Sequence, residues 1–223
     1  MKHVRIVGLC LTAMFALGMV ASTPALAVPE FEVCEEGGTE KWENHECNSG
    51  QGKGPWSFLK ITKSYTVEGT SAVSTLKSKI GKEEIIIECK KDKFTGSIEP
   101  AGKTKGKVTF ESCTVKKPGG CTVEIPSFEV TDQLVGKEDE FKPTKGEKKE
   151  VFVEIVIGTC VLKGTYQIKG IQKCELPSGE TGKVEHEIVC TPAGGKLTLG
   201  KEKADFESTL KVKLTNGWAW RSK

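Results

Sequence analysis

Eight cysteines lie in the chain after residue 27, and they restrict its possible folds more than any other feature: Cys34, Cys47, Cys89, Cys113, Cys121, Cys160, Cys174 and Cys190. Disulfides are typical of oxidising, extracytoplasmic compartments, and an even number of cysteines in an exported chain favours complete pairing. The sequence therefore predicts a fold that is held together by four disulfides.

Proximity along the chain favours the pairs Cys34–Cys47, Cys89–Cys113, Cys121–Cys160 and Cys174–Cys190. An alternative for the middle two is a hairpin link from Cys113 to Cys121 across Pro118-Gly119-Gly120, which leaves Cys89 for Cys160. Closing loops of such sizes stabilises a fold by roughly 3 to 4 kcal/mol each. A zinc site is a weaker alternative, because the sequence contains neither C-x-x-C nor His-x-x-x-His, and we predict no metal ligand.

The N-terminus has the three parts of a secretory signal peptide. Lys2 and Arg5 precede an apolar run over residues 6–20, and Ala25-Leu26-Ala27 matches a small-residue cleavage site. The apolar run is shorter than the roughly 20 residues of a spanning helix, so an uncleaved anchor is the weaker alternative. We expect residues 1–27 to be removed and the product to be secreted, extracellular and without a membrane span.

The charge balance gives no sign of a nucleic-acid partner. The whole chain carries a formal charge of +3, from 33 basic and 30 acidic residues, but two of the basic residues belong to the signal peptide. The remaining lysines alternate with glutamates, as they do on a solvated sheet face. A nucleic acid or an anionic membrane surface would require a basic patch, so we expect neither.

Alternation of apolar and polar residues predicts β-strands along most of the mature chain. The segments are 58–68, four short runs within Glu83–Pro126, 151–168, 184–190, 197–199 and 204–214. Residues 71–80 are also predicted as strand, although their apolar spacing fits one face of a helix. With no long helical window, the fold class is all-β: an antiparallel two-sheet sandwich or partly closed barrel, linked by disulfides.

The chain divides into a signal peptide (1–27), a loop-rich flap closed by Cys34 and Cys47 (28–56), and a β domain (57–223). We expect the charged segment 136–150 to be a long exposed loop, because mixed charge with Gly and Pro cannot bury a core. Residues 90–93 are predicted as a polar turn.

Three local features of the β domain lead to more specific expectations. A bulge near Ser112 would turn Cys113 inward. We expect residues 151–168 to form one strand with a bulge or a sharp bend at Gly158-Thr159, packed against the 83–126 region through Cys121 and Cys160. Asn216-Gly217 is a hairpin signal, so residues 218–220 should return along the preceding strand.

The sequence shows no constellation that would support catalysis. His186 lies on the apolar face of its strand, whereas Glu185 and Glu187 point to the opposite face, so a structural role is favoured over a catalytic base. His45 lies among acidic residues in the flap and is interpreted as an ordinary loop residue. Neither a nucleophile motif nor a nucleotide-binding glycine pattern occurs, so no catalytic residue and no cofactor are predicted.

The tryptophans are the candidate binding residues: Trp42, Trp56, Trp218 and Trp220. They lie in the flap and at the C-terminus, where stacked rings could form a platform for carbohydrate or cell-wall material. Packing of the C-terminal pair against the flap is the favoured alternative.

Several short motifs carry a resemblance to known proteins: Ile87-x-Cys89, Thr95-Gly96-x-Ile98, Phe110-x-x-Cys113, Gly120-Cys121-Thr122-Val123 and His186-x-x-Val189-Cys190. Through these motifs, the chain resembles secreted cysteine-rich β proteins of actinobacterial type that have no assigned activity. The resemblance implies export and a β fold, and it transfers no functional residue.

The sequence thus favours an exported, non-catalytic structural or binding module outside the cell or on its surface. Cell-wall material or a glycan is the candidate partner. The alternative is a secreted hydrolase or carbohydrate-active enzyme on a β scaffold, for which His186 or a pair of carboxylates would have to lie in a cleft.

Overall fold

The computed structural model describes residues 29–144, 150–177, 179 and 181–223, which form fifteen β-strands. The predicted signal peptide lies outside the described residues. The all-β prediction is confirmed, and so are the four favoured disulfide pairs. In the part of the chain that the structure describes, no helix is long and apolar enough to cross a membrane.

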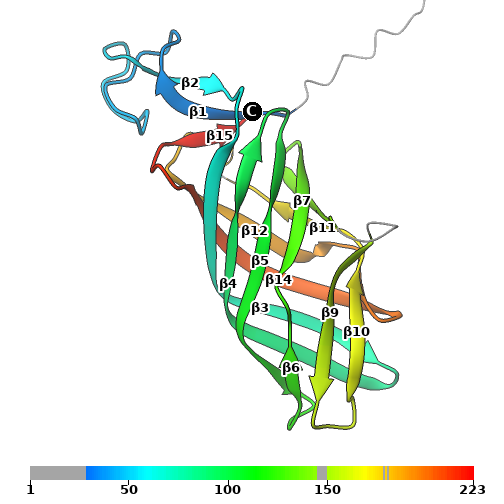
Figure 1. Ribbon diagram of the computed structural model, residues 1–223. Coiled ribbons are helices and arrows are strands. Elements are labelled where there is room, and N and C mark those ends of the chain that lie inside the picture. The colour runs from blue at the N-terminus through cyan, green and yellow to red at the C-terminus, as the bar shows by residue number, and fades with distance from the viewer. Residues whose placement is uncertain (1–28, 145–149, 178, 180) are drawn as a thin grey trace, which may run out of the picture.

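Eight strands pair edge to edge in a closed ring in the order β12-β11-β8-β7-β5-β4-β3-β14, and β14 pairs back to β12. All of these pairings are antiparallel, so the ring is an antiparallel barrel (Figure 1). The strands are β3 (Tyr65–Ile80), β4 (Glu83–Glu99), β5 (Lys103–Lys117), β7 (Phe128–Val135), β8 (Glu138–Pro143), β11 (Gln172–Glu175), β12 (Glu185–Gly195) and β14 (Glu202–Leu214).

Four further strands extend the barrel beyond this ring: β6 (Thr122–Glu124), β9 (Val151–Gly158), β10 (Gly164–Lys169) and β13 (Leu197–Leu199). They pair in the order β14-β13-β10-β9-β6, so the long strands β3, β4, β5 and β14 run through both parts. We call the part that contains β7, β8, β11 and β12 the closed half, and the other the open half. In the open half, β5 and β6 are not paired with each other within the described chain, which leaves a seam.

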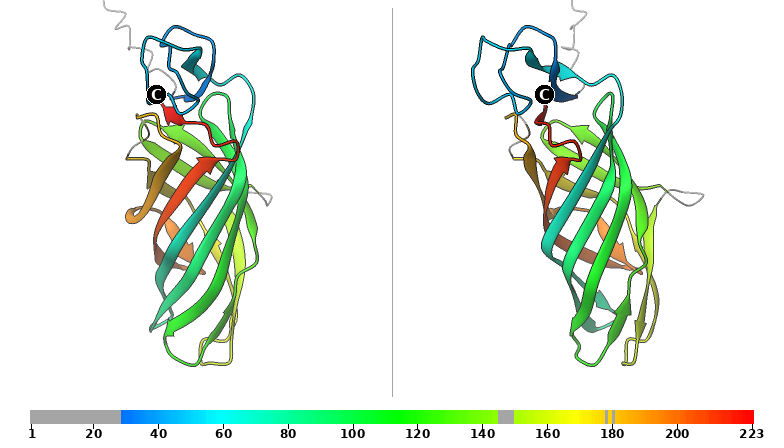
Figure 2. Two further views of the ribbon diagram at one scale, coloured as in Figure 1. Left: turned by 90° about the vertical axis from the view of Figure 1, so that its left-hand side faces the viewer. Right: turned by 60° about the vertical axis from the view of Figure 1, so that its left-hand side comes forward.

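The architecture agrees with the sequence in part. A barrel was one of the two predicted architectures, but its closed half is a complete ring rather than a partly closed one. Closure removes the free strand edges that a sandwich would have to protect. Figure 2 shows the long strands inclined along the barrel, with a small separate sheet at one end.

That small sheet is the cap, formed by β1 (Phe31–Glu36), β2 (Trp56–Lys60) and β15 (Trp220–Ser222) in the order β15-β1-β2. Its Phe31, Val33 and Trp220 belong to the same buried cluster as residues of the barrel's closed half. The cap therefore covers that end of the barrel. The segment predicted as a loop-rich flap contains β1 and a loop held by Cys34–Cys47.

The predicted polar turn at residues 90–93 is wrong, because β4 continues through it. Lys90 and Lys91 are both exposed, and Asp92 is buried again, so the inward-facing side of the strand changes at this point. The same change occurs in the neighbouring strand β3, where Ala72 and Val73 are both exposed. Two consecutive exposed residues thus mark the point where the strand's inward-facing positions shift by one residue, and they do not mark a turn.

The predicted irregularity at Ser112 is present, but its form differs from a one-residue bulge. Ser112 has a left-handed backbone with φ 53°, and Cys113 packs against the open-half core. β5 and β4 pair in the same register before and after Ser112. This is possible because the inward-facing side of β4 changes at the same level.

Residues 151–168 form two strands instead of one bent strand. β9 and β10 pair as antiparallel neighbours, with Ile155 opposite Tyr166, and residues 159–163 connect them. Thr159 adopts φ 61°, which turns the chain. Apolar alternation is the same in a bent strand and in the two arms of a hairpin, so the pattern could not distinguish them. The expected link between Cys121 and Cys160 is confirmed.

Two further expectations are corrected. The segment 136–150 contains strand β8, which buries Asp139, while residues 145–149 lie outside the described part. The turn at Asn216-Gly217 does not produce a hairpin with β14, because β15 pairs with β1 of the cap. Burial of the Trp220 ring, which is 2% exposed, favours this crossing.

The Cys121–Cys160 disulfide should contribute more to stability than the Cys34–Cys47 disulfide. It closes a sequence separation of 39 residues against 13, and the chain-entropy relation gives a difference of about 1 kcal/mol. We expect the double variant Cys121→Ser/Cys160→Ser to lose about 3 to 4 kcal/mol of unfolding free energy, measured by urea denaturation with the other disulfides intact. A larger loss in Cys34→Ser/Cys47→Ser would contradict this ranking.

Candidate ligand-binding cavity

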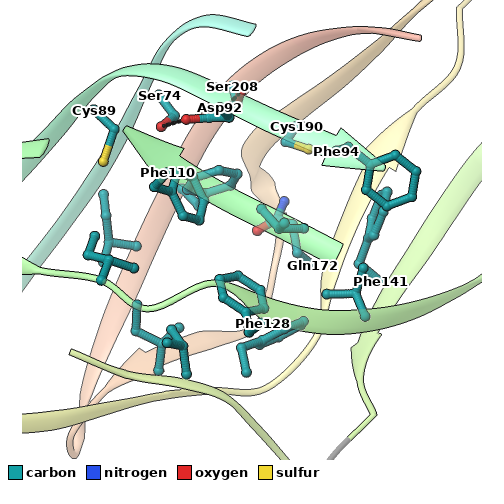
Figure 3. A pocket seen from close by; sticks show the side chains of 18 of the residues that line it. Ser74, Cys89, Asp92, Phe94, Phe110, Phe128, Phe141, Gln172, Cys190 and Ser208 are labelled. Carbon is teal, nitrogen blue, oxygen red and sulfur yellow. Dashed lines mark hydrogen bonds between the residues drawn. The ribbon is translucent and has the colours of Figure 1, made fainter. Parts of the chain in front are cut away.

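A cavity of about 140 Å³ lies inside the barrel where the closed and open halves meet. Its wall contains residues of both halves, such as Phe141 and Cys174 from the closed half and Leu197 from the open half. Six of the nine phenylalanines of the chain line it: Phe94, Phe110, Phe128, Phe141, Phe152 and Phe206. The interior is therefore apolar and aromatic at this level (Figure 3).

A row of small side chains explains why the barrel has room for this cavity. Directly paired residues cross six neighbouring strands, from β11 to β5, in the order Cys174, Cys190, Ser208, Ser74, Cys89 and Cys113. We call these residues the small-residue row. Two of the disulfides, Cys174–Cys190 and Cys89–Cys113, lie within it. Side chains of this size do not reach the barrel axis, so space remains between them.

Four of the rings form a connected aromatic wall: Phe206, Phe110, Phe128 and Phe152. The ring centroid of Phe110 lies 5.9 Å from that of Phe128 and 6.2 Å from that of Phe206. Phe128 in turn lies 6.0 Å from Phe152, in an edge-to-face arrangement. These distances are in the range of favourable aromatic pairs, which fixes the position of the rings and gives the wall a defined shape.

The ring of Phe94 occupies space that two glycines leave free. Gly96 and Gly106 are directly paired on β4 and β5. A Cβ atom at Gly106 would lie 2.5 Å from two ring atoms of Phe94, and one at Gly96 would lie 2.9 Å from its Cζ. Gly106 is therefore required for the ring to lie against the barrel wall, and Gly96 also for the close approach of the β5 backbone.

Asp92 is an ionisable group in the cavity wall with a fully engaged carboxylate. Ser74 Oγ donates to its Oδ1 at 2.8 Å, and Ser208 Oγ donates to its Oδ2 at 3.1 Å (Figure 3). The backbone N–H of Asp92 also donates to Ser71 Oγ at 3.3 Å. Burial raises the pKa of Asp92, and these hydroxyl contacts partly offset that effect. The polar cluster is satisfied internally at the point where the strands change phase.

Gln172 is a further polar residue of the wall, and its Oε1 atom is not engaged. The side chain is 5% exposed. Its Nε2 donates to the carbonyl oxygens of Lys173 at 2.9 Å and Thr191 at 3.0 Å. Its Oε1 is buried and accepts no hydrogen bond from any residue that the structure describes. An unengaged acceptor thus lies in a predominantly apolar wall.

Two further carboxylates are buried in the closed half, on neighbouring strands. Asp132 of β7 and Asp139 of β8 are 6% and 3% exposed. Burial, together with the charge of Asp139, raises the pKa of Asp132 well above its usual range, and burial raises the pKa of Asp139 to about 7. Hydrogen bonding to Thr104, which lies opposite Asp132 on β5, offsets only part of the burial effect on Asp132.

The histidines do not belong to the cavity wall. His186 is 1% exposed, and its Nε2 lies 2.7 Å from the carbonyl oxygen of Trp220. Its ring centroid is 4.2 Å from the Trp220 ring, so it is part of the packed core beneath the cap, as the favoured interpretation expected. His45 is exposed in the cap loop, 5.9 Å from the Trp56 ring. Among the described residues, no group of three or more His, Cys, Asp or Glu side chains is placed to hold a metal ion.

Three of the four tryptophans that the sequence suggested as a binding platform lie together at the cap, where Trp42 forms a β-bridge with Trp56 and the Trp56 ring contacts that of Trp218. Trp220 is buried in the core, whereas Trp42, Trp56 and Trp218 are half-buried at the cap. The rings of Trp56 and Trp218 are 5.7 Å apart and inclined at 74°. This edge-to-face packing gives no flat row of parallel faces, although it does place the C-terminal segment against the cap loop.

Sequence reasoning did not identify the cavity residues. Asp92 was assigned to a turn, and Gln172 follows a short glycine-containing segment with no strand pattern of its own. One signal was present, because Ser74, Cys89, Ser208 and Cys190 all fall where an apolar, inward-facing residue is expected. Small or polar residues at inward-facing positions on several strands indicate incomplete packing, but only the register shows that they share one level.

Comparison with known proteins gives no relative: no family model matches the chain, and neither a curated protein nor a solved structure matches it. A functional assignment therefore depends on the cavity and its chemistry.

The substitution Gly106→Ala should destabilise the barrel and narrow the cavity, because the new methyl group would displace the Phe94 ring. Overpacking of this kind costs about 1 to 3 kcal/mol of unfolding free energy, measurable by urea denaturation. Gly119→Ala is the matched control, since a Cβ there meets no atom within 4 Å. Equal stability of the two variants would show that Phe94 can move without cost.

The Asp132 and Asp139 pair should make the protein less stable as the pH rises. Both acids have a pKa in the folded state above the usual value of about 3.9, so the folded protein binds more protons than the unfolded chain above pH 4. The unfolding free energy should fall from about pH 4 to above pH 7. In Asp139→Asn this fall should be smaller by about 4 kcal/mol, measured by urea denaturation at several pH values. An unchanged pH profile would contradict the buried ionisable pair.

Proposed function

We propose that this protein is an extracellular binding protein that holds one small apolar molecule inside its barrel. The observation that carries the proposal is the cavity of about 140 Å³ with six phenylalanines in its wall. Ligand sites are typically concave and apolar, with a few polar groups that fix orientation. Here Gln172 is the candidate orienting group, because its Oε1 is buried and not engaged by the described residues.

The volume limits the size of the molecule. An engineered apolar cavity of about 150 Å³ in another protein stays dry and binds benzene. A cavity of 140 Å³ is suited to a single aromatic ring or a short alkyl chain. Longer molecules would require movement of side chains, for which the connected rings of Phe110, Phe128 and Phe206 leave little freedom.

The seam of the open half is the proposed entrance. Ile125, which follows β6, and Phe110 of β5 both line the cavity, and β5 and β6 flank the seam. A molecule that enters between them breaks no strand pairing recorded in the described chain. Elsewhere around the closed half, entry would require opening a hydrogen-bonded ladder.

Secretion is part of the proposal and is supported by the four disulfides, which are typical of proteins outside the cytosol. A second proposal, made from the sequence, is that the tryptophans at the cap bind a glycan. It is less well supported, because Trp220 is buried and the Trp56 and Trp218 rings are not parallel.

The enzymatic alternative, a secreted hydrolase or carbohydrate-active enzyme, has weaker support. His186 packs beneath Trp220 and does not line the cavity. Asp132 and Asp139 are a carboxylate pair, but both are almost fully buried. A glycosidase requires its two carboxyl groups to face a bound sugar from opposite sides.

Binding of toluene to the oxidised protein, residues 28–223, tests the proposed function. We expect saturable binding of one molecule per chain, measured by NMR titration. Toluene at ten times its Kd should raise the unfolding free energy by about 1.4 kcal/mol, because the ligand binds only the folded state.

Two valine substitutions provide the matched comparison. Val108→Phe adds a ring to the cavity wall and should abolish binding, whereas Val161→Phe makes the same change at a residue that is 85% exposed. The function is refuted if toluene does not bind the wild-type protein, or if both variants bind it equally well.

A further inference from the structure

The orientation of the Gln172 amide is determined by its surroundings. The side chain extends from β11, with Gly195 of β12 opposite it on one side and Phe141 of β8 on the other. Both N–H bonds of Nε2 are used, because the carbonyl oxygens of Lys173 and Thr191 accept them at 2.9 and 3.0 Å. A reversed amide would place Oε1 against two carbonyl oxygens, so the atom that remains unengaged is the acceptor.

Glycine at position 195 allows Oε1 to lie close to the backbone of β12. A Cβ atom there would lie 2.7 Å from Gln172 Oε1, the closest atom it would meet. No donor of the described residues takes this position, and Oε1 is buried without a partner. A buried amide oxygen without a donor costs free energy, and polar groups in protein interiors are as a rule paired. The cavity wall therefore contains a hydrogen-bond acceptor that no described residue of the chain uses.

Ionic ligands are poorly matched to the other groups of the wall. Both carboxylate oxygens of Asp92 already accept hydrogen bonds from Ser74 and Ser208. Lys93, although part of the lining, is exposed and forms an ion pair with Glu111. An anion would lie near Asp92 without a buried cation, and a cation would have to displace a serine hydroxyl. The site is suited to a neutral molecule.

We propose that Gln172 Oε1 accepts a hydrogen bond from an O–H or N–H group of a neutral aromatic or short aliphatic ligand in this cavity. The ligand class is thus a small phenol, alcohol or related donor rather than a pure hydrocarbon. This inference rests on the proposed function, because it assigns the polar contact of the same cavity. The phenylalanine rings hold the apolar part of the molecule, and Gln172 fixes the position of its donor.

Phenol and toluene test the inference, because they have similar size and differ in the donor. The measured quantity is the ratio of the Kd for toluene to the Kd for phenol. We expect this ratio to be about tenfold higher in the wild type than in Gln172→Met, which keeps a side chain of similar length but removes the acceptor. Leu197→Met is the matched control, since it introduces methionine elsewhere in the cavity wall and should leave the ratio unchanged.

A direct readout makes the test independent of whether Gln172→Met folds. In the wild type, phenol should shift the side-chain carbonyl carbon resonance of Gln172, and toluene should not. If toluene binds while phenol leaves this resonance unchanged, or if the ratio is the same in Gln172→Met, the inference is overturned and the proposed function stands. If neither ligand binds, both are overturned.

Discussion

The small-residue row is the constraint on which the rest of the barrel interior depends. A closed ring of eight strands has a fixed circumference, so its interior has to be filled by side chains that reach the axis. At the level of Ser74, Ser208 and the two cysteine pairs, the side chains are too short to do so. The disulfides Cys89–Cys113 and Cys174–Cys190 connect neighbouring strands at this level. Covalent links thus compensate for a level of the wall that encloses a space instead of a packed core.

The phase change of the long strands places polar groups at the same level. In β3 and β4, two consecutive residues are exposed, after which the opposite face turns inward. The inward positions next to this change are Ser71, Ser74 and Asp92, which hydrogen-bond with one another and with Ser208. Each group is buried at a cost, but the network satisfies both carboxylate oxygens. Gln172 differs from this network, because its acceptor has no protein donor, and this difference separates a structural polar cluster from a candidate binding group.

Local alternation predicted the strands where one face was mostly apolar, as in Ala204–Leu214, and proximity predicted all four disulfide pairs. Prediction failed where tertiary structure overrides the local pattern. β8 contains Glu138, Asp139 and Glu140, and it resembles a loop because its inward residue is an aspartate that other strands bury. The turn at Asn216-Gly217 favours a hairpin locally, but the chain crosses to the cap and buries Trp220 there.

The candidate site was not predictable for a related reason. Its phenylalanines are widely spaced in the sequence, and only the strand register brings Phe110, Phe128 and Phe206 together. A one-residue shift of any strand would turn its ring to the outer face, so the cavity is a property of the complete ring. Tryptophans in predicted loops favour a binding platform at the level of sequence, yet Trp220 packs in the core. The informative residues were instead the small and polar ones at inward-facing positions. A chain that places Ser, Cys and Gln where a barrel needs large apolar side chains sacrifices packing energy there, and a bound molecule would recover part of it.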